Sequence, residues 1–436
     1  MRSPRAERTD VTADPPPVRH GIRTPAFRRL LRVWFIALVG DGIRVTALPV
    51  FAAISTRDPL AVSAVAVAEV LPWLLVSLPA GALVDRMRPR TVVLCAHSAR
   101  ALLTAALAGL VLVNQAGVLV LVVFAFLVTS AQTFADSAEQ LLLVELAGPE
   151  DLDRANGWFV TAETIGLDLA GPLAAGLVLA AEPAGDGLVL AWPPALCFAL
   201  NALAFLVAAV EVARLPDVVP ERGEPAPGDQ RSALVRLRAD LLEGGRFLLR
   251  SRGLRALVGT VMITAFAVSA ANAVTALYVV QTLGAPAAVM SAMLIALSLG
   301  TLLAARVSPL LAGKVGDGPV MIGSLVLLGA GMVLVGAVPS VATAVLGYLV
   351  VGCAVGGWNV LAASRRQRLT PSRMMGRVSS TYRVLTWGFM PLGAGLAGPL
   401  AVQTSLRAVF LVVGVLIAAA ALLAARALLR VPEPAV

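Results

Sequence analysis

The chain has 436 residues, of which 58% are hydrophobic and only 14% are charged, and its formal net charge at pH 7 is +9. A soluble protein of this length carries nearer to a quarter of charged residues, so the composition excludes an ordinary soluble globular protein. The positive charge does not indicate nucleic-acid binding, because nearly all basic residues are arginines in short segments between apolar runs, where they report membrane topology.

Apolar runs of about 20 residues recur along the chain, and each is long enough to cross roughly 30 Å of hydrocarbon as a helix. The runs lack the alternation of polar and apolar residues that is typical of a membrane barrel. We therefore predict an all-α membrane protein with twelve transmembrane helices in two six-helix halves. The expected spans are residues 30–54, 59–83, 90–113, 118–144, 155–180, 189–211, 254–280, 286–311, 319–337, 340–363, 377–402 and 406–430.

The connections between these spans differ in basic residues. STRDPL, NQAG, AEPAGDG, QTLGAP and AVPS contain a single one, Arg57, whereas the alternate connections carry RMRPR, the long 212–253 segment, Lys314 and SRRQRLTPSRMMGR. Arginine and lysine are retained on the cytoplasmic side of a membrane. We expect both termini in the cytoplasm. The use of arginine instead of lysine, with abundant Ala, Val and Gly, favours the cytoplasmic membrane of a bacterium.

The expected organisation has five parts. Residues 1–29 are arginine-rich with no cleavage site after the first apolar run, and we interpret them as a disordered cytoplasmic tail. The first half covers 30–211, the second half 254–430, and a short tail 431–436. Between the halves, 212–253 begins with the flexible stretch LPDVVPERGEPAPGDQ and continues into an amphipathic helix on the cytoplasmic membrane surface, with a partner-binding helix as the alternative.

The two halves repeat one pattern of proline and glycine residues, and the three cysteines predict no disulfide framework. A proline before the fifth span and three glycines within it recur 222 residues later, before and within the eleventh span: Pro149, Gly166, Gly171 and Gly176 correspond to Pro371, Gly388, Gly393 and Gly398. Parallel repeats of this kind are typical of secondary transporters, with the substrate site between the halves. Cys95, Cys197 and Cys353 lack paired spacing, so we expect no disulfide, no metal site and no cofactor.

Three segments resemble the major facilitator superfamily. GALVDRMRPRTVVL (81–94) resembles its signature loop between spans two and three, with Gly81, Leu83, Asp85, Arg86 and Arg90 matching and Arg88 in place of a glycine. RANGWFVTAETIGLDLAGPLAAG (154–176) resembles the antiporter signature of span five through Gly166, Gly171, Pro172 and Gly176. QRLTPSRMMGRVSSTYRVLTWGFMPLGAGLAG (367–398) is similar to the macrolide-efflux and enterobactin-exporter branch. The basic residue usual in span four of proton-driven drug exporters is absent.

The resemblance implies a gate at the first of these segments. Asp85 would face the N-terminus of span eleven, near Gly376 and Arg377, where the helix end carries partial positive charge. The loop would then latch the two halves when the substrate site faces outward. The alternative is that Arg86, Arg88 and Arg90 only set orientation.

Ionisable residues inside the expected spans are concentrated in the first half. Charges at membrane depth are costly and usually serve a function. The first half holds Asp41, Arg44, Glu69, His97, Arg100, Asp136, Glu139, Glu163 and Asp168, and the second half holds Arg306 and Arg383. Between Glu243 and Glu433 the only acid is Asp317, in a loop. Any mid-membrane carboxylate that takes up a proton must therefore belong to the first half.

Among the proton-coupling candidates, Asp41 and Arg44 are three residues apart, share a helical face and are expected to neutralise each other. Glu69 has no opposite charge on its own helix. It is either the proton-coupling group or a static partner of Arg44 or Arg100.

Four further titratable residues have simpler interpretations. Asp136 and Glu139 lie nearer the cytoplasm, where loop-facing ion pairs are expected, and His97 is expected to be a packing residue and not a relay. Glu163 and Asp168, also coupling candidates, are five residues apart and do not share a face. One is expected to face the cavity while the other pairs with Arg383.

For substrate contact the second half offers these polar and aromatic residues: Asn272, Trp358, Asn359, Tyr382, Arg383 and Trp387. For either tryptophan, the alternative is an interfacial or packing role. We interpret the protein as a monomeric, proton-coupled exporter of amphipathic small molecules, such as antibiotics or siderophore-like metabolites. The alternatives are a proton-coupled importer and a non-transporting receptor or assembly protein. No HExxH or paired-aspartate motif favours an intramembrane enzyme.

Overall fold

The computed structural model describes residues 21–84, 86–181, 192–217 and 233–429, and all regular structure in these ranges is helical. The first half contains α1 (Pro25–Thr56), α2 (Pro59–Leu75), α3 (Ser77–Val84), α4 (Pro89–Leu112), α5 (Val118–Ala147), α6 (Leu152–Glu163), η1 (Thr164–Ala170), α7 (Gly171–Ala180) and α8 (Trp192–Ala213). The remainder contains α9 (Ala233–Arg250), α10 (Arg252–Leu277), η3 (Tyr278–Thr282), α11 (Ala288–Val315), α12 (Asp317–Ala337), α13 (Val341–Leu369), η4 (Ser372–Met374), α14 (Met375–Gln403) and α15 (Leu406–Leu428).

Eleven helical segments of the described chain are long and apolar enough to cross a membrane, and each coincides with an expected span. The remaining expected span, 59–83, is divided into α2 and α3 at Val76. Pro79 explains the break, because it has no N–H to donate to the carbonyl of Leu75 and its ring crowds that carbonyl. The membrane-spanning helical fold is confirmed, while the count of twelve crossings stays a prediction.

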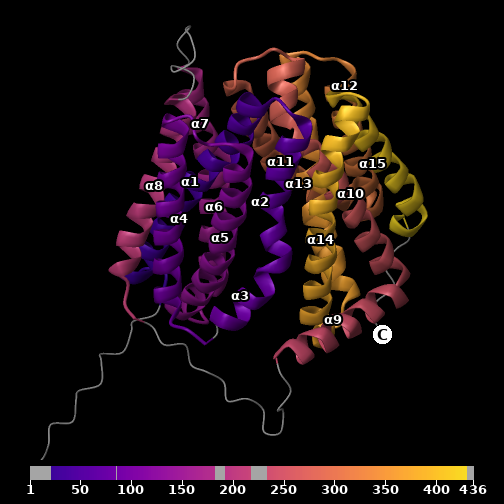
Figure 1. Cartoon of the computed structure of the whole chain (residues 1–436). Helices are drawn as coiled ribbons and strands as arrows, with labels where there is room; N and C mark the ends of the chain where they lie inside the picture. The colour runs from indigo at the N-terminus through magenta and orange to yellow at the C-terminus, as the bar shows by residue number, and fades with distance from the viewer. Residues whose placement is uncertain (1–20, 85, 182–191, 218–232, 430–436) are drawn as a thin grey trace, which may run out of the picture.

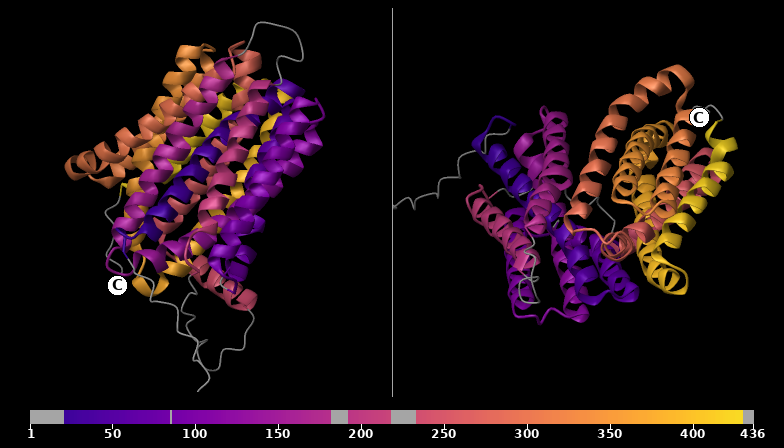
Figure 2. Two further views of the ribbon diagram at one scale, coloured as in Figure 1. Left: turned by 90° about the vertical axis from the view of Figure 1, so that its left-hand side faces the viewer. Right: turned by 90° about the horizontal axis from the view of Figure 1, so that it is seen from above.

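The helices form two groups that stand side by side (Figures 1 and 2). The first half, residues 25–213, lies at the left of Figure 1, and the second half, residues 252–428, lies at the right. The α3–α4 connection, α9 and the start of α14 lie at the lower end in that view. We call this the Arg-rich end, because the connections RMRPR and SRRQRLTPSRMMGR belong to it, and the other the Arg-poor end.

Small residues bring the halves together at the Arg-poor end. A Cβ atom on Gly176 of α7 would lie 2.7 Å from Cβ of Ser291 on α11. A Cβ atom on Gly398 of α14 would lie 2.8 Å from Oγ of Ser63 on α2. The two glycines are the repeat-related pair of the sequence analysis, and each sits against a serine of the opposite half. Small residues at such positions let helix backbones approach closely in a membrane.

The contact between the halves continues toward mid-depth and then diverges. Trp73 of α2 meets Trp387 of α14 edge to face, with ring centroids 4.7 Å apart and planes at 85°. At the Arg-rich end, Figure 1 shows α3 and the start of α14 apart from each other. The two halves are therefore in close contact at the Arg-poor end, whereas their ribbons stand apart at the other.

Two expected boundaries shift. Residues 25–29, expected in the N-terminal tail, form the start of α1, whose cap Thr24 accepts a hydrogen bond from the N–H of Phe27. The expected disorder of residues 1–20 and the expected C-terminal tail 431–436 lie outside the described residues. In the 212–253 segment, α9 packs on α14, where Leu248 is buried and Arg377 bonds Glu243 at 3.0 Å.

Candidate functional site

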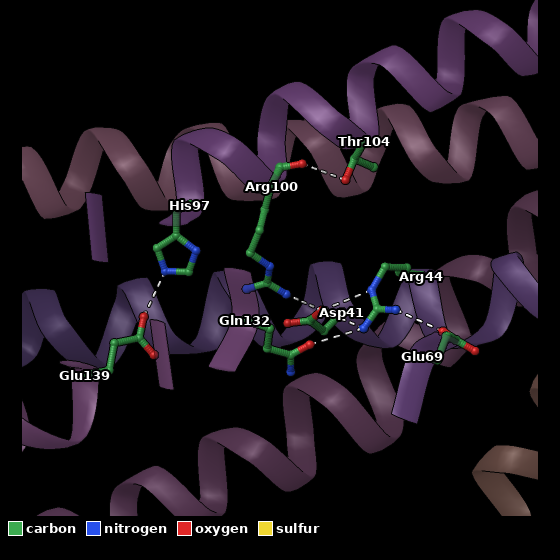
Figure 3. A network of polar contacts seen from close by, with 8 residues as sticks. All are labelled: Asp41, Arg44, Glu69, His97, Arg100, Thr104, Gln132 and Glu139. Carbon is green, nitrogen blue, oxygen red and sulfur yellow. Dashed lines mark hydrogen bonds and ion pairs between the residues drawn. The ribbon is translucent and has the colours of Figure 1, made fainter. Parts of the chain in front are cut away.

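A buried ionic network joins α1 to three neighbouring helices of the first half (Figure 3). Asp41 lies at its centre, 3% exposed, and its Oδ1 accepts hydrogen bonds from two arginines. Arg44, one turn further along α1, donates through Nη2 at 3.3 Å and through Nε at 3.4 Å. Arg100 of α4 donates through Nη2 at 2.5 Å. The expected pairing of Asp41 with Arg44 is present, and a second arginine joins it.

Arg44 extends the network to α2 and α5. Its Nη1 donates to Oε1 of Glu69 at 2.9 Å, and its Nη2 donates to Oε1 of Gln132 at 3.3 Å. Glu69 therefore has a partner across helices, which is one of the two roles that the sequence left open. Two arginines and two carboxylates are combined, so their formal charges cancel. Such balance is what makes buried ions tolerable, because an isolated ion at this depth is costly to desolvate.

The side chains of this network differ in solvent exposure. The side chains of Asp41 and Arg44 are each 4% exposed and that of Arg100 is 1% exposed, whereas 18% of the Glu69 side chain is accessible. On α2, Glu69 lies one turn before Trp73, which contacts Trp387 of the second half. Glu69 is thus the accessible end of the network and borders the contact between the halves.

The other first-half acids divide into two environments. Glu139 of α5 is buried and its Oε1 lies 2.8 Å from Nε2 of His97, so the expectation that it is a loop-facing ion pair is wrong. Asp136, one turn earlier, is half-buried. The expectation failed because α4 supplies a polar partner in the interior, and the spacing along α5 does not report that contact.

Glu163 and Asp168 lie on the fifth span. Glu163 is exposed at the end of α6 and Asp168 is half-buried in the π-helix η1. Within the described residues neither forms an ion pair with Arg383, which is exposed on α14, so that expected pairing is not observed. The role of Glu163 and Asp168 as coupling candidates stays a prediction.

The antiporter-like residues bring η1 and α7 against α1 and α11. A Cβ atom on Gly171 would lie 2.5 Å from Cα of Gly42, and one on Gly166 would lie 3.1 Å from Cβ of Leu38. Pro172 has no N–H to donate to the carbonyl of Asp168 four residues earlier. Oγ of Ser298, on α11 of the second half, donates to that carbonyl at 3.0 Å. A π-helical stretch, frequent at functional sites, thus lies at a contact between the halves.

The expected gating loop is partly described. Asp85 lies outside the described residues, Gly81 is half-exposed on α3, and Arg86 is exposed. Arg88 forms an ion pair with Asp217 at 2.5 Å, and Arg90 donates to the carbonyl of Ala213. In this conformation the arginines 88 and 90 bind the end of α8 in their own half. The latch to α14 stays a prediction.

The substrate candidates occupy different surroundings. Asn272 of α10, Asn359 of α13 and Arg383 of α14 are exposed. Trp358 is buried in a cluster of α10, α12, α13 and α15, which is the packing role left open for it. Tyr382 is half-buried, with the guanidinium carbon of Arg366 4.3 Å above its ring. These positions stay candidates for substrate contact, with Trp387 the one that meets the first half directly.

Sequence reasoning missed Gln132, Trp73 and the serines at the contact between the halves. Two of these carried a usable signal: Gln132 shares a helical face with Asp136 and Glu139, and Trp73 lies four residues after Glu69. Ser63, Ser291 and Ser298 carried none, because small hydroxyl residues are common in membrane helices. Among the described residues, no group of three potential ligands could hold a metal ion.

Comparison with known proteins identifies the family to which this architecture belongs. A family model described as the Major Facilitator Superfamily matches residues 33–391 and, in a second match, residues 257–436. The chain belongs to the major facilitator superfamily. The superfamily consists of transporters, so the protein is a transporter and not an enzyme.

Relatives narrow the branch. The multidrug efflux pump Tap of Mycolicibacterium fortuitum is 29% identical over 391 residues, covering 88% of this chain and 91% of the relative. The protein of the same name from Mycobacterium tuberculosis (strain ATCC 25618 / H37Rv) is 29% identical over 426 residues, covering 94% of each. The predicted membership of the superfamily and of its efflux branch is confirmed.

Solved structures agree with the fold. The nucleoside transporter NupG superposes with a TM-score of 0.74 at 15% identity, covering 93% of this chain and 100% of that one. A bacterial homologue of the iron transporter ferroportin in an inward-facing state gives 0.69 at 16% identity, covering 92% and 97%. At this identity the likeness concerns the fold alone. The protein is a multi-pass membrane transporter of the major facilitator superfamily.

Proposed function

We propose that this transporter exports amphipathic small molecules in exchange for protons by alternating access. The relatives named multidrug efflux pumps support export of small molecules. The arginine distribution supports a cytoplasmic Arg-rich end and both termini in the cytoplasm, in a bacterial cytoplasmic membrane. With that orientation, the conformation described above is closed outside and spread toward the cytoplasm.

The single observation that carries proton coupling is the ion pair of Arg44 with Glu69. The pair is formed between α1 and α2, and Glu69 keeps an accessible edge beside the contact of α2 with α14. A proton on Glu69 would remove its charge attraction to Arg44 and leave Arg44 and Arg100 to share the single carboxylate of Asp41. Protonation therefore changes the charge balance at a contact between the halves, which is what links proton binding to alternation.

The substrate is proposed to bind between the halves, near Glu69, Trp73 and Trp387. This position offers one accessible carboxylate and aromatic surface, a combination that suits amphipathic molecules with a cationic or polar group. In the antiport cycle, substrate enters from the cytoplasm while Glu69 is ionised, as its pairing with Arg44 suggests for this conformation. A proton binds from outside after substrate has left.

The opening between the halves is proposed to close through the gating loop. When the cytoplasmic end closes, Asp85 would approach the N-terminal end of α14, where the helix dipole favours a carboxylate. Arg88 and Arg90 would meanwhile hold the loop to the end of α8.

The proposed function is tested by comparing cells and proteoliposomes with and without the protein. An efflux-deficient host expressing the chain should tolerate higher concentrations of some antibiotic classes in a susceptibility panel and accumulate less ethidium. In proteoliposomes, an imposed pH gradient should drive ethidium movement opposite to protons. Accumulation that rises with expression would indicate import. The absence of movement for every compound in the panel would contradict the transport of amphipathic molecules.

A further inference from the structure

A second pair of titratable side chains lies beside the ionic network. His97 of α4 and Glu139 of α5 are 1% and 3% exposed, and Nε2 of the imidazole lies 2.8 Å from Oε1 of the carboxylate. Figure 3 shows the pair at the opposite end of the labelled group from Glu69, with Arg100 and Asp41 between. Nothing in the proposed exchange at Glu69 uses these two residues.

The pair lies nearer the Arg-rich end than the network does. His97 is eight residues from the start of α4 and Glu139 is eight from the end of α5, which places both about 12 Å from those helix ends. Asp41 is sixteen residues from the start of α1, or about 24 Å. The titratable groups of the first half therefore form a series from mid-depth toward the Arg-rich end.

Each element packed around His97 presents identifiable groups. Helix α5 supplies Glu139 and, one turn earlier, Asp136, while α4 itself supplies Arg100 at the next turn. Asp41 of α1 is reached through its bond to Arg100. The acid of α8, Glu211, is bonded to arginines 29, 32 and 214.

Helix α8 supplies the aromatic ring of Phe205, which contacts both His97 and Arg100. It is stacked with the imidazole of His97 at a centroid distance of 6.0 Å, and the guanidinium carbon of Arg100 lies 3.9 Å from its centroid. The two basic side chains thus share one aromatic neighbour.

The two ring nitrogens of His97 have different surroundings. Nδ1 is buried and has no hydrogen-bond partner among the described residues. With one proton, on Nε2, the imidazole donates to an ionised Glu139 and Nδ1 carries only a lone pair; the pair then has charge −1. A further proton makes the pair neutral, either as imidazolium with carboxylate or as imidazole with carboxylic acid. The imidazolium form, and the form in which the carboxylic acid donates to Nε2, place an N–H at Nδ1, where a buried donor without an acceptor is unfavourable. A carboxylic acid protonated on Oε2 instead accepts from Nε2 through Oε1 and leaves Nδ1 with its lone pair.

We propose that His97 and Glu139 form a second proton-binding site of the transport cycle. The inference rests on the proposed proton exchange and adds a site to it. Histidine ordinarily exchanges a proton near neutral pH, which suits a group that must load and unload within a cycle. A conformation that offers Nδ1 an acceptor would favour the loaded state, so proton binding and conformation are linked.

Arg100 connects this site to the network at Glu69. A proton on the pair adds positive charge beside Arg100, which shares the Phe205 ring with His97 and donates to Asp41. Asp41 in turn holds Arg44, the partner of Glu69. Proton binding at one site therefore makes proton binding at the other less favourable, because each proton adds positive charge to the same series of buried ions. The two sites would release protons in order, not independently.

The chain is well suited to a direct test, because it has only two histidines. His20→Gln leaves His97 as the single imidazole, and ¹⁵N-histidine labelling of the purified full-length protein then reports its protonation by NMR over about pH 5 to 9. We expect the signal to titrate. In Glu139→Gln the midpoint should move to lower pH, because the anion that stabilises the imidazolium is gone. Glu69→Gln should move it by less in the same direction, and Glu150→Gln, at an exposed carboxylate between α5 and α6, should leave it unchanged.

A signal that stays in one protonation state across this range, or a midpoint unaffected by Glu139→Gln, would overturn the second site. The same proteins are assayed for ethidium transport driven by a pH gradient. A titrating His97 without any gradient-driven transport would overturn the proposed exchange while leaving the site. If the His97 signal does not titrate but gradient-driven transport is normal, the second site is overturned and the proposed exchange stands. The two failures are therefore distinguishable.

Discussion

Arg44 of α1 donates to Glu69 of α2 at 2.9 Å while its own helix neighbour Asp41 occupies the other edge of the guanidinium. The arginine is therefore held between two carboxylates with different exposure. Asp41 is enclosed, and Glu69 is accessible from the side of α2 that borders the second half. This difference agrees with the sequence analysis, in which Asp41 neutralises Arg44 and Glu69 is the candidate for proton coupling.

The first prediction concerns Glu69→Gln. The amide keeps an oxygen that can accept the hydrogen bond of Arg44 but cannot titrate. We expect the variant to fold, to bind ethidium and to exchange it by counterflow, since neither process needs net proton movement. Transport driven by a pH gradient should fall at least about tenfold, the least that loss of a titrating coupling group should cost.

The measurement is made in proteoliposomes, with Glu150→Gln as the control for loss of a carboxylate. Gradient-driven transport at the normal rate would contradict the assignment, and Asp41, Glu163 and Asp168 would become the candidates.

Asp41→Asn should act on stability first. It leaves Arg44 and Arg100 in the interior with a neutral amide in place of their shared carboxylate, and removing one partner of a buried ion pair costs about 3–5 kcal/mol. A thermal unfolding midpoint well below that of the parent is expected. The double variant Asp41→Asn with Arg100→Gln should recover part of the loss, because it removes the cation that the first change left uncompensated. Equal midpoints for the parent and Asp41→Asn would show that the network contributes little to folding.

The sequence predicts some of these contacts and not others, for a physical reason. Asp41 and Arg44 are three residues apart on one helix, so their pairing follows from helical geometry alone. The bonds of Arg100 to Asp41 and of Glu139 to His97 join different helices, and their partners depend on how α1, α4 and α5 rotate against one another. Hydropathy located the spans closely because their length is set by the bilayer. It did not predict the break at Val76, although Pro79 was visible.

The helix α9 provides a third prediction, with matched variants at adjacent glycines. A Cβ atom on Gly244 would lie 2.5 Å from Oγ1 of Thr381 and 2.6 Å from the carbonyl oxygen of Arg377, whereas one on Gly245 would lie 4.0 Å from the nearest side chain. Gly244→Val should therefore detach α9 from α14, and amide hydrogen exchange in residues 242–250 should rise at least about tenfold, or roughly 1.4 kcal/mol of local stability.

Gly245→Val carries the same change in helix propensity without the clash and should alter exchange much less. Glu243→Gln should also have a small effect, because the ion pair with Arg377 is about half-exposed and such pairs contribute about 1 kcal/mol or less. Equal exchange in the two glycine variants would mean that α9 is not held by this contact.

The last prediction tests the closed Arg-poor end at Gly398. A Cβ atom there would lie 2.7 Å from the carbonyl oxygen of Pro59 and 2.8 Å from Oγ of Ser63, both on the opposite half. Gly398→Val should force α2 and α14 apart only when this end is closed, so it should favour the conformation in which the end is open. Overpacking of this kind costs about 1–3 kcal/mol, which shifts the ratio of the two conformations roughly 5- to 150-fold.

The readout is labelling of a single cysteine at Val67, after replacement of the three native cysteines. Cγ2 of Val67 lies 3.5 Å from the position of a Cβ atom built on Gly395 of α14. A membrane-impermeant maleimide added from the Arg-poor side should react faster in Gly398→Val than in the parent. Gly323→Val, on α12, meets nothing within 4 Å and should leave the rate unchanged. Slower labelling in Gly398→Val would reverse the assigned direction. Equal labelling in both variants would mean that the small residues do not control closure, since the strain at Gly398 exists only while α2 and α14 are in contact.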